Sequence, residues 1–236
     1  MNQFWEDKLA SGYYDQITLD GIKNNRGLRA CWHNYTNLKI SKNIDNNSRH
    51  LDYACGSGTL IGNYLLSDSI GVDISQNQID YARNKYSKDK FFNINEFDFS
   101  LYENYFDTIS VAGLIEFVEF DDTIDLINRL TFILKPGGQL LITTPNFKLP
   151  MLFLVTIQNF FGKYSYRDTH INKLTTRKMK NLLKSTYFEE YEVSNYMNVA
   201  VFFSIFNLKS STKLMKTIDY FFSQYFGFMI FAKLKK

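Results

Sequence analysis

Short apolar runs alternate with segments of helical periodicity along the middle of the chain. The strand-like runs are "LDYAC" (51–55), "SIGVDI" (69–74), "FFNI" (91–94), "FDTISVAG" (106–113) and "QLLITT" (139–144). Helical segments follow the first, second and fourth runs, at 59–66, 75–86 and 121–134. A helix at 174–186 and strands near 187–196 and 227–234 are expected later. This alternation predicts an α/β fold, with a parallel sheet covered by helices on both faces.

The same pattern divides the chain into three parts. Residues 1–47 are polar, with apolar positions at roughly helical spacing, and predict a helical N-terminal cap. Residues 48–146 hold the regular alternation, and 147–236 add further elements. No internal repeat or Pro- or Ser-rich linker separates these parts, so we expect 1–236 to form a single domain.

Two glycines, Gly56 and Gly58, follow the first strand at a spacing that indicates close approach of a nucleotide-bearing ligand. The NAD fingerprint G-x-G-x-x-G fails, because its third glycine falls on Ile61. Asp52 precedes the glycines and could face an ammonium group, whereas Asp73 ends the second strand and could accept both hydroxyls of a ribose. A ligand that carries both an amino acid and a nucleoside is S-adenosylmethionine.

Four segments in order extend this interpretation into a family resemblance. "LDYACGSG", "GVDIS", "NYFDTISVAGLIEFVE" and "ILKPGGQLLITTPN" resemble the motifs of class I S-adenosylmethionine-dependent methyltransferases, within the methyltransferase type 11, ubiquinone O-methyltransferase-like subgroup. The resemblance covers about 48–146. It implies a Rossmann-like, doubly wound sheet of seven strands, mostly parallel with one antiparallel strand near the C-terminus.

The resemblance also implies roles for individual residues. The methionine part of the cofactor is expected at Asp52, Ala54, Gly56 and Gly58, the ribose at Asp73 and one face of the adenine at Ile74. Asn95 and Glu96 stand where the family places a side chain near the adenine amino group, and Tyr14 resembles a lid tyrosine over the cofactor. Two positions depart from the pattern: Ala54 replaces the first glycine, and Phe117 stands where the subgroup often has histidine after Glu116.

Methyl transfer from a sulfonium requires alignment of the acceptor and, for a hydroxyl acceptor, a base. The candidate catalytic residues are Glu116, Asp168 and His170; the subgroup often shows a similar Asp/His stretch on the substrate side. No metal is expected. The product would be S-adenosylhomocysteine.

Composition narrows the partners. With a net charge of +3 and no dense basic cluster, the chain is not expected to bind nucleic acid, and Cys31 and Cys55 have no metal-ligand spacing. The N-terminus lacks a basic region followed by an apolar run, which favours a cytoplasmic location. The aromatic-rich segments 147–166 and 198–226 could instead face a core, a substrate or the inner face of a membrane.

Two classes of function therefore remain at this stage. The first is a methyltransferase acting on a small molecule, expected to be the hydroxyl of an apolar, lipid-linked or glycan acceptor, with N-methylation as a variant. The second is an inactive binding or scaffold protein that retains the fold. The intact Asp52, Gly56, Gly58 and Asp73 favour the first.

Overall fold

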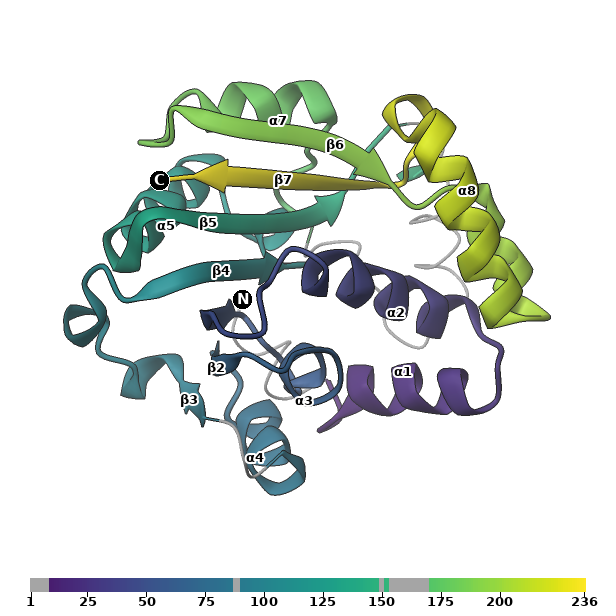
Figure 1. Ribbon diagram of the computed structural model, residues 1–236, viewed down its shortest axis with the longest axis horizontal. Coiled ribbons are helices and arrows are strands. Elements are labelled where there is room, and N and C mark those ends of the chain that lie inside the picture. Colours follow the sequence, from purple (N-terminus) through teal and green to yellow (C-terminus); the bar gives the residue numbers. More distant parts are fainter. Residues whose placement is uncertain (1–8, 87–89, 149–150, 153–169) are drawn as a thin grey trace.

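The computed structural model describes residues 9–86, 90–148, 151–152 and 170–236. Within them one sheet has the strand order β3-β2-β1-β4-β5-β7-β6 (Figure 1). The strands are β1 (Arg49–Tyr53), β2 (Asp68–Asp73), β3 (Lys90–Asn93), β4 (Phe106–Ala112), β5 (Leu134–Pro145), β6 (Glu190–Tyr196) and β7 (Met229–Lys235). β7 runs antiparallel to β5 and β6, and the other pairs are parallel. The expected seven-stranded, mostly parallel sheet is confirmed.

Helices cover both faces of this sheet (Figure 1). The helices of the described chain are α1 (Tyr13–Lys23), α2 (Leu28–Ser41), α3 (Thr59–Tyr64), α4 (Gln76–Lys85), α5 (Phe120–Ile133), α7 (Thr176–Leu183) and α8 (Leu208–Phe226). Alternate residues of β5 show the two layers. Leu140 and Ile142 join the core formed with α5 and α7, whereas Leu141 joins the core formed with α2 and α8. Burial on both faces explains why "QLLITT" has no polar position in its centre.

The fifth strand is longer than its apolar run indicated. β5 begins at Leu134 and includes "KPGG", which sequence analysis placed before the strand. Phe106 pairs with Leu134 and Thr108 pairs with Gln139, and the register shifts between these pairs. Such a bulge accommodates additional residues in one strand, which the hydrophobic pattern alone does not reveal.

The C-terminal helix turns a different face to the core than its apolar spacing indicated. Residues Leu208, Ser211, Thr212 and Met215 of α8 are buried. The sequence indicated an apolar stripe of Leu214, Ile218, Phe221, Phe222 and Tyr225. Ile218 packs against this core, whereas the other four side chains are 40–70% exposed. The core-facing alternative therefore holds for Ile218 and is wrong for the rest of the stripe. Of 147–166, the structure describes only 147–148 and 151–152.

Among the described residues, no helix combines the length and the apolar character needed to span a bilayer.

Candidate cofactor and acceptor site

The candidate residues gather where the parallel strands end. Asp52 lies in β1, Asp73 ends β2 and Glu116 follows β4 in the 3-10 helix η4 (Ile115–Phe117). Carboxyl ends of parallel strands lie at one edge of a sheet, and a crevice forms where the strand order reverses, here between β1 and β4. The sheet topology thus brings residues more than sixty positions apart to one edge.

The loop at 54–58 is shaped by backbone conformations that favour glycine. Ala54, Gly56 and Gly58 have φ values of 65°, 52° and 74°. Ala54 therefore takes the left-handed conformation of the family's glycine at a modest energetic cost. A Cβ at Gly56 would meet no atom within 4 Å. This open space adjoins the loop backbone and can admit a ligand.

Asp73 fixes the glycine loop to the end of β2. Its two carboxylate oxygens accept hydrogen bonds from the backbone N–H groups of Gly56 and Ser75, both at 2.8 Å. Burial raises the pKa of this carboxyl, and the two N–H donors oppose the rise. Each oxygen retains acceptor capacity for a ribose hydroxyl.

Asp52 ends a chain of three buried polar side chains. The Ser110 hydroxyl donates to Asp52 Oδ1 at 2.6 Å and lies 3.1 Å from His50 Nε2. Because that hydroxyl has one proton, His50 Nε2–H is the donor to Ser110 Oγ. Burial raises the pKa of Asp52 to about 7; the Ser110 hydrogen bond opposes this rise and the Asp73 charge adds to it. Burial lowers the pKa of His50 to about 3, so its ring is neutral.

These groups fit S-adenosylmethionine. Two carboxyl groups, Asp52 and Asp73, influence one another, and neither takes part in an ion pair among the described residues. A site of this kind favours a cationic ligand, and the cofactor carries an ammonium and a sulfonium. Open space at Gly56 leaves room for its amino-acid part. Within the described ranges, no three His, Cys, Asp or Glu side chains form a metal site.

The N-terminal segment closes onto the glycine loop through Gln78, a residue that sequence analysis did not select. Gln78 Oε1 accepts from Ser57 Oγ at 2.7 Å and from Gly12 N at 3.1 Å. Its Nε2 donates to the Ala10 carbonyl at 3.1 Å. A Cβ on Gly12 would lie 2.2 Å from the Tyr81 ring, so this close approach requires glycine.

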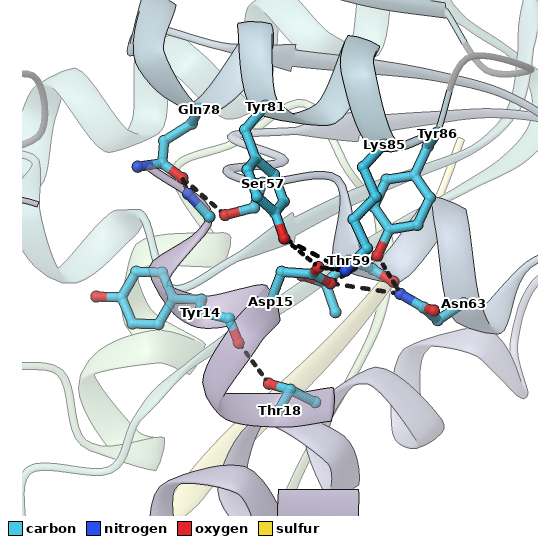
Figure 2. Close-up of polar contacts among 11 residues, drawn as sticks. Tyr14, Asp15, Thr18, Ser57, Thr59, Asn63, Gln78, Tyr81, Lys85 and Tyr86 are labelled. Atoms are coloured by element: carbon cyan, nitrogen blue, oxygen red, sulfur yellow. Dashed lines mark hydrogen bonds and ion pairs between the residues drawn. The ribbon is translucent and has the colours of Figure 1, made fainter. Parts of the chain in front are cut away.

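Asp15, in the first turn of α1, anchors that helix to α3 and α4. Figure 2 shows its carboxylate between α3 and α4, where it is fully buried. It accepts from Tyr81 at 2.9 Å and from Tyr86 at 2.7 Å, and it pairs with the Lys85 ammonium. Asn63 adds a longer contact of 3.4 Å. Asp15 therefore connects the N-terminal cap to the cofactor half of the sheet.

The expected lid residue, Tyr14, is half-buried and points away from the Asp15 cluster (Figure 2). Its ring centroid lies 4.9 Å from that of His33 in α2. The two rings are tilted by 58°. Burial and the nearby Arg29 lower the pKa of His33 to about 4, so its imidazole is neutral. Contact of Tyr14 with the cofactor stays a prediction.

The residues predicted to lie near the adenine are held by Asn93, which sequence analysis passed over. Its amide donates to the Ile74 carbonyl at 3.0 Å and its oxygen accepts from Asn95 N at 3.1 Å. Asn95 is exposed at the start of a 3-10 helix, η2 (Ile94–Glu96). Glu96 pairs with Arg83 at 2.6 Å and caps Asn93 N at 3.3 Å. The cofactor roles of Ile74, Asn95 and Glu96 remain predictions.

Glu116, a predicted catalytic residue, is a buried carboxyl in η4. It is 4% exposed, and the Thr144 hydroxyl donates to its Oε2 at 3.1 Å. Burial raises the pKa of Glu116 to about 7, and the hydrogen bonds only partly oppose the rise. Sequence analysis placed this residue in the site, but its burial follows from the packing of η4 beneath the segment that begins at His170.

His170 lies beside Phe117, and the two residues that follow it bond to the Glu116 backbone. Ile171 N and Asn172 N donate to the Glu116 carbonyl at 2.9 and 3.1 Å. The His170 ring stacks on Phe117 at a centroid distance of 5.0 Å. Burial and Lys173 lower its pKa to about 4, so the imidazole is neutral near pH 7. The third candidate, Asp168, lies outside the described residues.

Tyr196 is a further buried polar side chain whose pKa is influenced by Glu116. Its buried hydroxyl lies 3.1 Å from Thr36 Oγ1 of α2, and the Glu116 charge adds to the burial that raises its pKa. β6 ends at this residue, so the sheet topology brings it level with Pro145 of β5 through their common partner Met229. A strand-terminal tyrosine was the only sequence signal that could have identified it.

The chain matches a known protein family. A family model described as a methyltransferase domain matches residues 29–193. No curated protein matches the chain.

Several solved structures share its fold. A SAM-dependent methyltransferase from Archaeoglobus fulgidus aligns with a TM-score of 0.61 and 17% identity, over 87% of this chain and 94% of that chain. A possible histamine N-methyltransferase from Thermotoga maritima gives 0.60 and 17%, over 86% and 89%. Phosphoethanolamine N-methyltransferase 2 from Haemonchus contortus, in complex with phosphomonomethylethanolamine and S-adenosylhomocysteine, gives 0.55 and 20%, over 85% of this chain and 52% of that one.

The match to the family model spans more than half of the chain, and the strand order accords with the fold of these solved structures. The ubiquinone subgroup is not confirmed by these comparisons. The chain belongs to the methyltransferase domain family and is a class I S-adenosylmethionine-dependent methyltransferase.

Proposed function

We propose that the protein methylates a hydroxyl group of a small, largely apolar acceptor, with Glu116 as the proton acceptor. The observation that carries the proposal is a buried carboxyl group with a pKa of about 7 at the carboxyl end of β4. General bases are most effective when their pKa lies near the operating pH. A hydroxyl must lose its proton as it is methylated, and ionised Glu116 can take that proton.

Bound S-adenosylmethionine supplies a methyl group on a positively charged sulfur, which transfers by in-line displacement and leaves S-adenosylhomocysteine. In our proposal, Asp52 receives the cofactor's ammonium, Asp73 its ribose hydroxyls, and the loop at 54–58 its methionine chain. The N-terminal segment held by Gln78 and Asp15 excludes water from this half of the site. Most of the catalytic benefit then comes from alignment of acceptor and methyl group.

The surroundings of Glu116 favour an apolar acceptor. The aromatic rings of Phe117, Phe147 and His170 pack together next to it, with centroid distances of 5.0 and 5.4 Å from the histidine ring. Since His170 is neutral near pH 7, we assign it to this wall and, as a second choice, to proton acceptance. Asp168 keeps its predicted role on the substrate side.

A lipid-linked acceptor is the finer version of this proposal. The exposed stripe of Leu214, Phe221 and Tyr225 on α8 supports contact with a lipid surface, because large apolar side chains rarely gather in solvent without a partner. We expect the double variant Phe221→Ser with Tyr225→Ser to reduce turnover of an acceptor embedded in vesicles while leaving a water-soluble analogue unaffected. Equal turnover of both acceptors by the variant and the parent protein would remove the lipid surface from the proposal.

One assay distinguishes hydroxyl methylation from the two alternatives, N-methylation and an inactive binding or scaffold protein. Release of S-adenosylhomocysteine would be measured with phenols, sugars, lipid-linked alcohols and amines as acceptors. We expect turnover with hydroxyl acceptors that rises through pH 7 and is lost in Glu116→Gln. Turnover with amines alone would instead establish N-methylation, and binding of S-adenosylhomocysteine without turnover on any acceptor would indicate a binding or scaffold protein.

A further inference from the structure

A second concave surface lies at the edge of the sheet, between α7 and the end of β6. It is a groove with a volume of about 530 Å³, within the range of small-molecule sites. Its lining comprises Lys148, Thr175, Thr176, Arg177, Lys180, Asn181, Lys184, Tyr191 and Asn195. We call this surface the basic groove. None of its residues was assigned to the methyl-transfer site.

The charge of the basic groove is uncompensated. Four of its lining residues are cationic, Lys148, Arg177, Lys180 and Lys184, and all four are exposed. No acidic residue lines the groove, and none of the four cations takes part in an ion pair within the described part of the chain. Cations that converge on one concavity repel each other unless an anion lies between them.

The helix dipole accounts for only part of this placement of charge. The first turn of α5 contains Asp121 and Asp122, which suit the positive end of a helix. The first turn of α7 contains no acidic residue and includes Arg177, whereas Lys180 lies in its last turn and Lys184 at its C-cap. Lys180 and Lys184 therefore suit the negative end of α7, and Arg177 adds positive charge at its positive end. It is the convergence of Arg177 and these lysines on one groove, and not the helix itself, that indicates an anionic ligand.

The polar floor of the groove is fixed in position. Asn195 is 3% exposed, and its Oδ1 accepts from Thr176 Oγ1 at 2.7 Å and lies 3.3 Å from Asn146 Nδ2. These contacts join α7 to the carboxyl ends of β5 and β6. Lys148 and the cations of α7 therefore line a groove whose polar residues Thr176 and Asn195 are hydrogen-bonded to each other.

We propose that the basic groove binds a phosphate-type anion. Arg177 offers the planar donor fork that matches phosphate oxygens, and Lys148, Lys180 and Lys184 supply further charge-assisted donors. The volume exceeds that of one phosphate ion, which leaves room for a larger phosphorylated molecule. The source of the phosphate is either a soluble phosphorylated molecule or the headgroup of an anionic phospholipid. The site does not depend on the acceptor proposed above.

Calorimetric titration of the full chain with pyrophosphate tests this site. We expect saturable binding that weakens at least ten-fold in the double variant Arg177→Gln with Lys180→Gln. The matched control is Lys213→Gln with Lys216→Gln, which removes the same charge from three-lysine surroundings on α8 and should bind like the parent protein. Thermal unfolding of each variant checks that it is folded, and Lys148→Gln with Lys184→Gln repeats the test from the other residues of the groove.

Sedimentation with vesicles distinguishes the two sources. Binding to phosphatidic acid vesicles, but not to phosphatidylcholine vesicles, that is lost in the groove variant identifies a lipid headgroup. Pyrophosphate binding without vesicle binding identifies a soluble phosphorylated ligand. The proposal is overturned if neither probe binds saturably, or if the groove variant and the α8 control weaken binding equally, because net charge alone would then be responsible.

Discussion

Asp52 and Glu116 are two buried carboxyl groups at the same edge of the sheet, and burial raises the pKa of each to about 7. Their neighbours differ. Asp52 lies near a second carboxyl, Asp73, beneath an N-terminal segment tied down by Gln78. Glu116 has one side-chain donor, Thr144, and aromatic rings beside it. Burial produces a similar pKa in both places, so the neighbours distinguish the two roles that we propose: a cationic cofactor would ionise Asp52, whereas Glu116 would take a proton from the acceptor.

The largest effect that could break this comparison is expected from Glu116→Gln. Without a proton acceptor, kcat with a hydroxyl acceptor should fall roughly 10²- to 10⁴-fold. In the parent protein kcat should rise as pH increases through about 7, since only the ionised carboxylate accepts a proton. Steady-state kinetics at about pH 5.5–9, a range that spans a pKa near neutrality, measure the loss of kcat and its pH dependence. The exposed Glu119→Gln is the matched control, and near-normal kcat in the Glu116→Gln variant would contradict the assignment.

Asp73→Ala should give the next largest effect, on cofactor affinity. Loss of charge-assisted hydrogen bonds to the ribose should weaken S-adenosylhomocysteine binding by about 30- to 100-fold. Asp68→Ala, at the opposite and exposed end of β2, should bind normally. Calorimetric titration of the parent protein and both variants with S-adenosylhomocysteine and with NAD measures these affinities. Preference of the parent protein for NAD would be incompatible with the cofactor assignment.

Asp15→Ala tests how much the contacts of Asp15 with Lys85, Tyr81 and Tyr86, called here the N-terminal latch, stabilise the fold. The change leaves Lys85, Tyr81 and Tyr86 without their common acceptor and should lower the free energy of unfolding by about 2 kcal/mol; solvent screening of the partly exposed Lys85 limits the loss. Urea unfolding measures it. Asp20→Ala, on the exposed side of α1, should change stability little. Equal stability of Asp15→Ala and the parent protein would show that the latch is not needed.

The smallest effect is expected from Ser110→Ala. The Ser110 hydroxyl lowers the pKa of Asp52, so its removal should raise that pKa further. Binding of S-adenosylhomocysteine should then weaken about 3- to 10-fold at pH 7, by no more than one lost charge-assisted hydrogen bond, and recover at higher pH as Asp52 ionises. Calorimetry at two pH values provides the measurement. A pH-independent loss would mean that Ser110 acts only through packing.

How far the sequence predicts this molecule depends on the range of the interactions. Gly56, Gly58 and Asp73 lie within one strand–loop–strand stretch, and their pattern predicted both the sheet and the cofactor. Asp15 and Gln78 act through partners up to seventy residues away, so no local pattern marks them. Tyr196 reaches the site only because β6 and β5 share β7 as a neighbour. For α8, the apolar spacing was real, but tertiary packing selected another face for the core.

The most direct test of the two-carboxyl account is the proton balance of S-adenosylhomocysteine binding. Below pH 7 Asp52 is mostly protonated in the free protein, and the ligand's ammonium favours its ionised form, so binding should release a proton. Calorimetry at pH 6.5 (about half a unit below the raised pKa) in two buffers of different ionisation enthalpy counts that proton. We expect release from the parent protein and from Glu116→Gln, and none from Asp52→Asn. Release that survives in Asp52→Asn and disappears in Glu116→Gln would reverse the roles assigned to the two carboxyl groups.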